Sequence, residues 1–217
     1  MKRANLLLAV LAAVLSISCA GLIQASPPPF VFSEPEVFRY ETSRSDNVSL
    51  IVNVWQRTYA VPGTTTSEVA ENLASLRRAG SGHGPYSAST KWDFQIGMRY
   101  ADEPGGCRLA AATVEIIAVI TLPALESPEA LLAWERVSWH NFIANLEGHE
   151  LEHLANEIEG AHRLQSALLA LPTLETCGAV GDAANRLVAI EERATVEADA
   201  RLDAETKHGA LTGATFP

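Results

Sequence analysis

The sequence has little positive charge and, beyond its first residues, no long apolar run. Lysine and arginine number 16 against 26 acidic residues, which gives a formal net charge of −10. An acidic chain gains nothing from counterion release at a phosphate backbone, so nucleic acid and anionic membrane surfaces are not expected partners. No apolar run after residue 25 is long enough to span a bilayer, and no internal repeat is present. These absences favour one globular domain with a full core.

Cysteine is also scarce, with three residues in the chain: Cys19, Cys107 and Cys177. Removal or lipidation of Cys19 during export would leave an even pair. In an oxidising compartment such a pair favours a disulfide. The alternative is a pair of zinc ligands, but Cys107 and Cys177 lack the C-x-x-C spacing of such sites. We therefore expect a Cys107–Cys177 disulfide.

Residues 1–25 have the features of a secretory signal peptide. A short basic segment precedes the apolar run Leu6–Ile17, which is too short to cross a membrane. Small residues allow cleavage after Ala20 or Ala25. Lipidation at Cys19 is an alternative, although Ser16 stands where a bacterial lipobox has leucine. The sequence thus predicts an exported protein, periplasmic or extracellular, either free or lipid-anchored.

The rest of the chain divides into a strand-rich half and a helical half. We expect a proline-rich linker over residues 26–38 and a single domain over residues 39–217. Period-two patterns and β-branched residues predict strands, and turn signals separate them from a small helix over residues 66–78. The predicted strands are Val48–Trp55, Arg57–Val61 as its continuation or partner, Thr90–Tyr100 and Cys107–Leu122.

Everything after Ser127 has a helical pattern. One helical region covers Pro128–Leu171, with a break expected near Gly148. A second covers Asp182 to about Thr206, with one face formed by Leu187, Ile190, Ala194 and Ala198. Strands first and helices second predict an α+β fold whose N-terminal sheet is antiparallel or mixed.

The segment His149-Glu150-Leu151-Glu152-His153 is the strongest chemical signal in the chain. It has the pattern H-E-x-x-H inside a predicted helix, so the two histidines share one face and can reach one metal ion. Glu150 lies beside that face, where its carboxylate can contact a water without binding the ion. The same segment also fits the inverted pattern H-x-x-E-H, with Glu152 as the base. An exposed helix with solvated histidines is the structural alternative.

Catalytic zinc takes three protein ligands, so a third is needed. Glu157 shares the histidine face, but it lies eight residues, or about 12 Å, from His149 on a straight helix. We therefore expect Glu157 to lie behind the ligands or to be a solvated charge. His162 lies further along the helix and is not expected to face the metal. His208 lies just past the last helix, where Gly209 can turn the chain. Spacing alone leaves His208 open between a ligand and a helix C-terminal histidine stabilised by the helix dipole.

Several segments together resemble the DUF922 family of bacterial proteins, which are described as predicted secreted zinc-dependent proteases. The resemblance runs from about Tyr59 to Gly213. It implies His149 and His153 as zinc ligands, Glu150 as catalytic residue and His208 as the third ligand. The chain has Leu202-Asp203 where relatives commonly carry a tyrosine before the aspartate. The segments are Tyr59–Gly63, Thr90–Trp92, Cys107, Ile120–Pro123, Trp139 with Phe142, His149–His153 and Thr206–Gly209.

These features predict a secreted or periplasmic zinc-dependent peptidase that acts on peptides or proteins. Glu150 would take the proton of the attacking water and pass it to the leaving amine. Candidate donors to the oxyanion are Tyr59, His83 and His140. The alternative is a non-catalytic envelope-associated protein with a structural zinc site or a decayed active site. The sequence indicates neither the substrate nor the oligomeric state.

Overall fold

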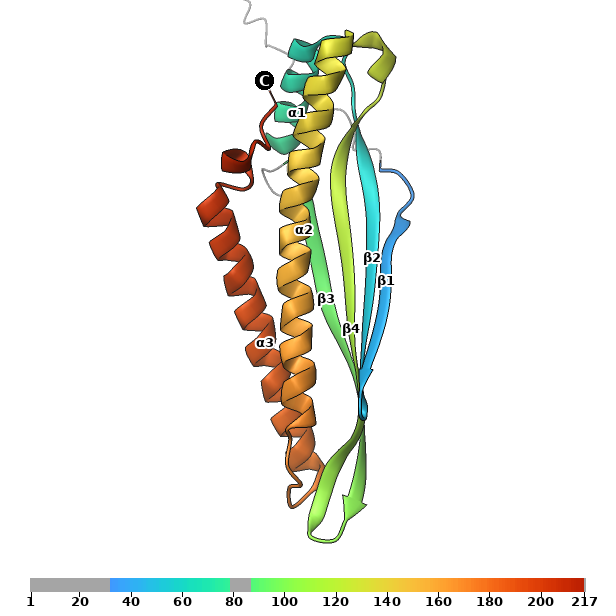
Figure 1. The fold of residues 1–217 in the computed structure, drawn as a ribbon, viewed down its shortest axis with the longest axis vertical. Helices are drawn as coiled ribbons and strands as arrows, with labels where there is room; N and C mark the ends of the chain where they lie inside the picture. Colours follow the sequence, from blue (N-terminus) through green and yellow to red (C-terminus); the bar gives the residue numbers. More distant parts are fainter. Residues whose placement is uncertain (1–31, 79–86, 217) are drawn as a thin grey trace, which may run out of the picture.

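The computed structural model describes residues 32–78 and 87–216. The fold is α+β, with a mixed four-stranded sheet in the order β1-β2-β4-β3 (Figure 1). β1 and β3 run antiparallel to their neighbours, whereas β2 and β4 are parallel. The strands are β1 (Glu36–Ser45), β2 (Val48–Val61), β3 (Ser89–Glu103) and β4 (Gly106–Leu125), and the helices are α1 (Thr66–Arg78), α2 (Ala133–Leu169) and α3 (Cys177–Thr206).

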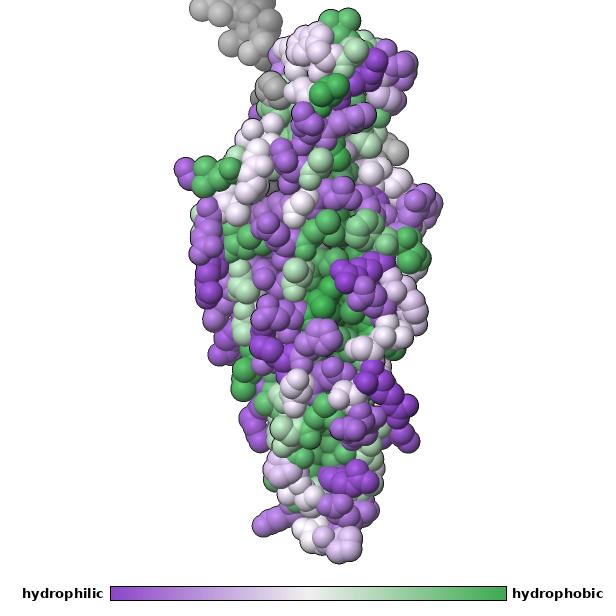
Figure 2. All heavy atoms as spheres, viewed as in Figure 1, coloured by the Kyte–Doolittle hydropathy of each residue, from purple (hydrophilic) through white to green (hydrophobic). Residues whose placement is uncertain are grey.

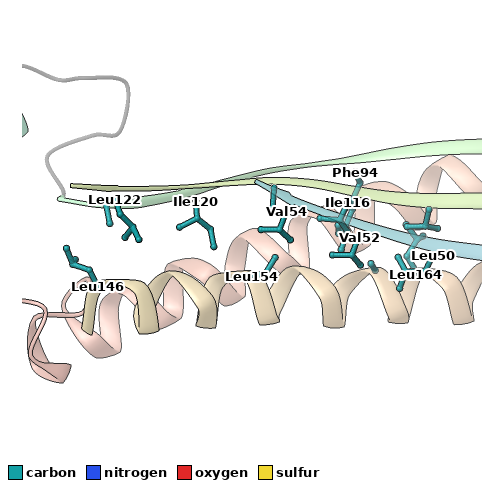
Figure 3. Close-up of a cluster of buried hydrophobic side chains, with 14 of the residues drawn as sticks. Leu50, Val52, Val54, Phe94, Ile116, Ile120, Leu122, Leu146, Leu154 and Leu164 are labelled. Carbon is teal, nitrogen blue, oxygen red and sulfur yellow. The ribbon is translucent and has the colours of Figure 1, made fainter. Parts of the chain in front are cut away.

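One face of the sheet packs on α2, which runs along the strands, and α3 lies beside α2 (Figure 1). Alternate residues of β2 and β4 point into this interface, because successive side chains of a strand face opposite sides. Figure 3 shows the apolar residues of the strands opposite those of α2. The interface includes Leu50, Val52, Val54, Ile116, Ile120, Leu122, Leu146, Leu154 and Leu164, all buried. Each such side chain contributes roughly 1.5–3 kcal/mol by leaving water.

The strand predictions hold for position but not for length. Arg57–Val61 continues the strand that begins at Val48, so the two predicted pieces are one strand, β2. β4 passes through Pro123 and ends at Leu125. Proline is tolerated there because the pairing with β3 ends at Thr121, which leaves Pro123 paired only with β2. β1 was not predicted, and it begins at Glu36 within the expected linker.

The two long helices differ from the prediction at their ends and at Gly148. The expected break is wrong, because α2 is continuous from Ala133 to Leu169. Leu146 and His149, which flank Gly148, are both buried. Their tertiary packing therefore keeps α2 continuous through the glycine, despite its low helix propensity. α3 begins at Cys177, earlier than predicted, with the Thr176 hydroxyl accepting from the Ala179 amide.

The predicted apolar face of the second helix is also partly wrong. Ile190 is 58% exposed, whereas Val180, Ala184 and Thr195 are the buried residues of α3. Hydrophilic side chains lie along the outer side of α3 (Figure 2). Leu187 of the predicted face does pack against the core, so the face that α3 buries combines aliphatic residues with the small residues Ala184 and Thr195.

The expected disulfide is present between Cys107 and Cys177. It joins the start of β4 to the start of α3, across a sequence separation of 70 residues. Backbone hydrogen bonds between Cys107 and Leu174 reinforce this junction. Closing a loop of this length in the unfolded chain stabilises the fold by about 4 kcal/mol in the chain-entropy view.

Three predictions lie outside the described residues: the signal peptide, lipidation of Cys19 and a role for His83. Where the chain is described, none of its helices has the length and apolar character needed to cross a membrane.

Candidate metal centre

Two histidine rings of α2 converge on one carboxylate of α3. The i, i+4 spacing puts His149 and His153 on the same face, with ring centroids 4.8 Å apart. Their Nε2 atoms are 3.3 Å apart. Asp203 Oδ1 lies 3.1 Å from His149 Nε2 and 3.2 Å from His153 Nε2. Three potential donor atoms from two antiparallel helices therefore surround one point.

This donor set fits a zinc ion. Bonds of about 2.0–2.2 Å to a tetrahedral ion put neighbouring ligand atoms roughly 3.3–3.6 Å apart. The separations among His149, His153 and Asp203 are close to that range. Two imidazoles and a carboxylate are also the kind of ligands that catalytic zinc uses. A cation at this point would satisfy both ring nitrogens and the carboxylate at once.

Asp199 fixes the orientation of the second histidine. Its Oδ1 atom lies 3.1 Å from His153 Nδ1. Trp92 Nε1 and Asn156 Nδ2 donate to the two oxygens of Asp199, at 3.1 and 3.0 Å. A proton on Nδ1 directed at Asp199 leaves the Nε2 lone pair of His153 facing His149 and Asp203. Such carboxylate–histidine contacts are the usual support of a zinc ligand.

The two histidines differ in electrostatic surroundings. Burial lowers the pKa of His149, and the charge of His153 lowers it further. For His153, burial also acts to lower the pKa, but the hydrogen bond and charge of Asp199 outweigh it, with help from Glu150 and Asp203. The net pKa of His153 is raised. His149 is thus held neutral, the form that binds a metal.

Glu150 lies next to the histidines in a buried position, with 4% of its surface exposed. Thr90 of β3 donates its hydroxyl to Glu150 Oε2 at 2.8 Å. Burial raises the pKa of Glu150 to about 7, and Asp203 adds to the rise, while Thr90 and His153 oppose it. A carboxyl with a pKa near neutrality is suited to take and return a proton at neutral pH.

Glu152 has a different environment from Glu150. It is exposed and does not line the cavity that holds Glu150 and the histidines. The geometry therefore favours the H-E-x-x-H reading over the inverted one. This follows from the two-residue step, which turns Glu152 about 200° away from Glu150.

The expected third ligand, His208, lies beside the cluster on the loop after α3. Its Nδ1 atom is 3.0 Å from Asp203 Oδ1. At this site, the group of described residues whose ligand atoms all lie within 4.8 Å of one another contains His149, His153 and Asp203, and His208 is not a member of it. His208 therefore contacts the cluster through Asp203. The sequence comparison noted Asp203 ahead of the segment Thr206–Gly209 but did not assign it a role.

A glycine lets this loop approach the face of α2 that carries His149 and His153. Gly209 has φ +78°, and a Cβ atom there would lie 3.2 Å from His149 Cγ. The preceding residues Lys207 and His208 also have positive φ. The chain thus turns sharply at the end of α3 and passes over His149, which brings His208 to the site.

Three other predictions can be compared with the structure. Glu157 is not a solvated charge: it is completely buried, and neither of its oxygens has a hydrogen-bond partner in the described chain. Burial raises its pKa to about 9, with Asp199 and Glu150 adding to the rise.

Tyr59 donates its hydroxyl to the Ser87 carbonyl at 2.7 Å, and His140 lines a different cavity. Neither of these two oxyanion candidates lines the cavity of Glu150.

A cavity of about 430 Å³ opens above the cluster. Its walls come from α1, the start of β3, α2, the end of α3 and the C-terminal segment. The lining residues that bear on function are Arg77, Thr90, His149, Glu150, Asp203 and Lys207. The volume is that of a site for a peptide segment or small ligand.

Residues 56–209 match the family model described as a bacterial protein of unknown function, DUF922. The match covers more than half of the chain, so the protein belongs to this family. No curated protein matches the chain, and no solved structure does.

Proposed function

We propose that this DUF922 protein is an exported zinc-dependent peptidase with Glu150 as its general base. The observation that carries the proposal is the convergence of His149 Nε2, His153 Nε2 and Asp203 Oδ1 beside the buried carboxyl of Glu150. We assign the metal to His149, His153 and one third ligand from the contacting pair Asp203 and His208, which leaves the fourth position open. When bound, zinc supplies a Lewis acid and lowers the pKa of water.

In the proposed reaction, Glu150, Thr90 and Asp199 have separate roles. Glu150 takes the proton of the attacking water and returns it to the amine that leaves. Thr90 holds Glu150 Oε2 in place, so that Oε1 is the oxygen left to accept the proton. Asp199 keeps His153 in the tautomer that presents Nε2.

Export is the second part of the proposal. The Cys107–Cys177 disulfide supports an oxidising compartment, where such bonds persist. The expected signal peptide over residues 1–25 supports the same location, with lipidation of Cys19 as the alternative to its removal. The substrate is then a peptide or protein of the periplasm or the exterior.

A structural zinc site is the second candidate. The contact between His208 and Asp203 favours it, because His149, His153, Asp203 and His208 could close a four-ligand site. Such a site needs no nearby base. The buried Glu150 and the adjoining cavity favour catalysis instead.

The test is a pair of glutamine substitutions, Glu150→Gln and Glu152→Gln, in zinc-loaded protein. Cleavage of an unfolded protein such as casein is measured with and without chelator, alongside zinc content. We expect Glu150→Gln to keep zinc and lose at least about 100-fold in activity, in line with general-base contributions. Glu152→Gln should stay close to wild type. Zinc binding with no cleavage by the wild-type protein would favour the structural site.

A further inference from the structure

Two cationic side chains line the cavity of Glu150, and no ion pair joins either of them to a carboxylate of the described residues. Arg77, at the end of α1, and Lys207, at the end of α3, both belong to its walls. Within residues 32–78 and 87–216, neither forms an ion pair or a side-chain hydrogen bond. By contrast, Arg163 pairs with both Glu159 and Glu191. In a chain with ten more acidic than basic residues, two such cations in the lining of one cavity make that part of it suited to an anionic group.

Arg77 lies at the surface at the end of α1, within electrostatic range of Tyr59. Burial raises the pKa of Tyr59, and the positive charge of Arg77 opposes that rise, so the guanidinium lies near the phenol. The Tyr59 hydroxyl donates to the Ser87 carbonyl, and Ser87 lines the cavity. The next residue, Arg78, is exposed like Arg77 but does not line the cavity. The cationic wall therefore depends on Arg77 itself.

The chemistry of these groups selects a carboxylate. A guanidinium presents two parallel N–H donors that match the two oxygens of a carboxylate, and an ammonium adds a second positive charge. The floor of the same cavity carries Glu150, Asp199 and Asp203, which repel a carboxylate placed beside them. A carboxylate on a bound peptide is thus directed to the rim, away from the reacting atoms.

We infer that Arg77 and Lys207 form a subsite that binds a carboxylate of the substrate, so that the cavity prefers acidic peptides. The inference rests on the proposed peptidase function in one respect: it treats the bound peptide as a substrate. Binding of the carboxylate does not itself require cleavage. The carboxylate has two sources: an aspartate or glutamate side chain, or the C-terminus of the peptide.

The test measures binding of unlabelled peptides by isothermal titration calorimetry, in a Glu150→Gln background that prevents turnover. Four peptides of one length carry either Glu or Gln at one internal position, each with either a free or an amidated C-terminus. Arg77→Gln is compared with the matched control Arg78→Gln, which removes the same charge one residue away. Arg77→Glu tests the sign of the preference.

We expect Arg77→Gln to weaken binding of carboxylate-bearing peptides by at least about fivefold, as loss of a hydrogen bond to a charged group does. Binding of the amidated Gln peptide should change less than about twofold, and Arg78→Gln should leave all peptides unchanged. Arg77→Glu should favour a peptide with Lys in place of Glu. Loss confined to free C-termini identifies the terminal carboxylate, and loss confined to Glu peptides identifies the side chain.

Equal loss for neutral and acidic peptides, or equal loss in Arg78→Gln, would overturn the subsite. Cleavage by the unsubstituted protein separates the two proposals. A protein that cleaves peptides without regard to their carboxylates refutes the subsite and leaves the peptidase standing. One that binds acidic peptides through Arg77 and cleaves none supports the subsite and refutes the peptidase. Absence of binding to every peptide refutes the subsite.

Discussion

The α2–α3 contact at Gly160 allows a quantitative test of the packing that brings Asp199 and Asp203 to the histidines. A Cβ atom added at Gly160 would lie 2.3 Å from Thr195 Oγ1 of α3. Thr195 is fully buried, and its hydroxyl has no hydrogen-bond partner among the described residues. Because a threonine in a helix has few rotamers, Gly160→Ala forces the hydroxyl to rotate or α3 to move.

Two opposing effects set the size of the change. Alanine is a better helix former than glycine by about 1 kcal/mol. Overpacking of a buried contact costs about 1–3 kcal/mol, and a 2.3 Å approach belongs at the upper end of that range. We expect Gly160→Ala to lower the free energy of unfolding by about 1–2 kcal/mol. The other neighbours of the new methyl, Arg163 and Phe94, lie at 3.5 and 3.6 Å and need not move.

A double-mutant cycle isolates the contact. Thr195→Ala removes the clashing atom, so Gly160→Ala in that background should become neutral or stabilising by up to about 1 kcal/mol. Thr195→Val is the matched control: it keeps a group at the same place, so the clash should persist. Thr195→Val by itself removes a buried hydroxyl without a partner and should not destabilise.

The assay is urea unfolding followed by circular dichroism, with the disulfide intact and the metal removed. A Gly160→Ala protein as stable as the wild type would refute the reasoning. So would a destabilisation that Thr195→Ala fails to relieve, because the close approach of the two helices would then not be its cause.

Two further predictions concern the metal centre and the buried carboxyl behind it. Asp203→Asn should lower zinc affinity by more than about 100-fold, and His208→Ala by about tenfold or more, since loss of outer contacts alone typically costs 10–100-fold. Chelator competition measures both, and wild-type affinity in either variant removes that residue from the ligand set. Because the pKa of Glu157 is raised to about 9 in the folded protein, the metal-free protein should lose stability as pH rises from about 4.5 to 9. Glu157→Gln should weaken that loss in urea unfolding at pH 5, 7 and 9, and an unchanged pH slope would contradict the assigned burial effect.

Local sequence patterns determined much of the candidate site. The spacing of His149 and His153 puts them on one helix face wherever the helix lies, because 3.6 residues complete a turn. The same periodicity places Glu150 and Glu152 on opposite sides of that face, and only packing against β3 buries Glu150. The scarcity of cysteine similarly left Cys107 and Cys177 as the pair to be joined. These features depend on neighbours a few residues apart or on counting, and both are visible in a sequence.

Partners from other elements could not be found in this way. Asp199 and Asp203 repeat the four-residue spacing of the histidines, and this acidic pair on the next helix was the available signal. Yet only the antiparallel packing of α3 on α2 decides which acid meets which histidine. The same holds for Thr90 on Glu150 and for Arg77 at the cavity wall.

The sequence by itself therefore determined the α+β class, the two histidines on one helix face with Glu150 next to them, and the cysteine pair. Tertiary structure alone decided that α2 passes unbroken through Gly148, that β1 joins the sheet, and that Asp203 lies between the histidines and His208. The physical reason is range. Helix and strand periodicities act over a few residues, whereas the register between packed elements depends on side chains that fit together from distant parts of the chain.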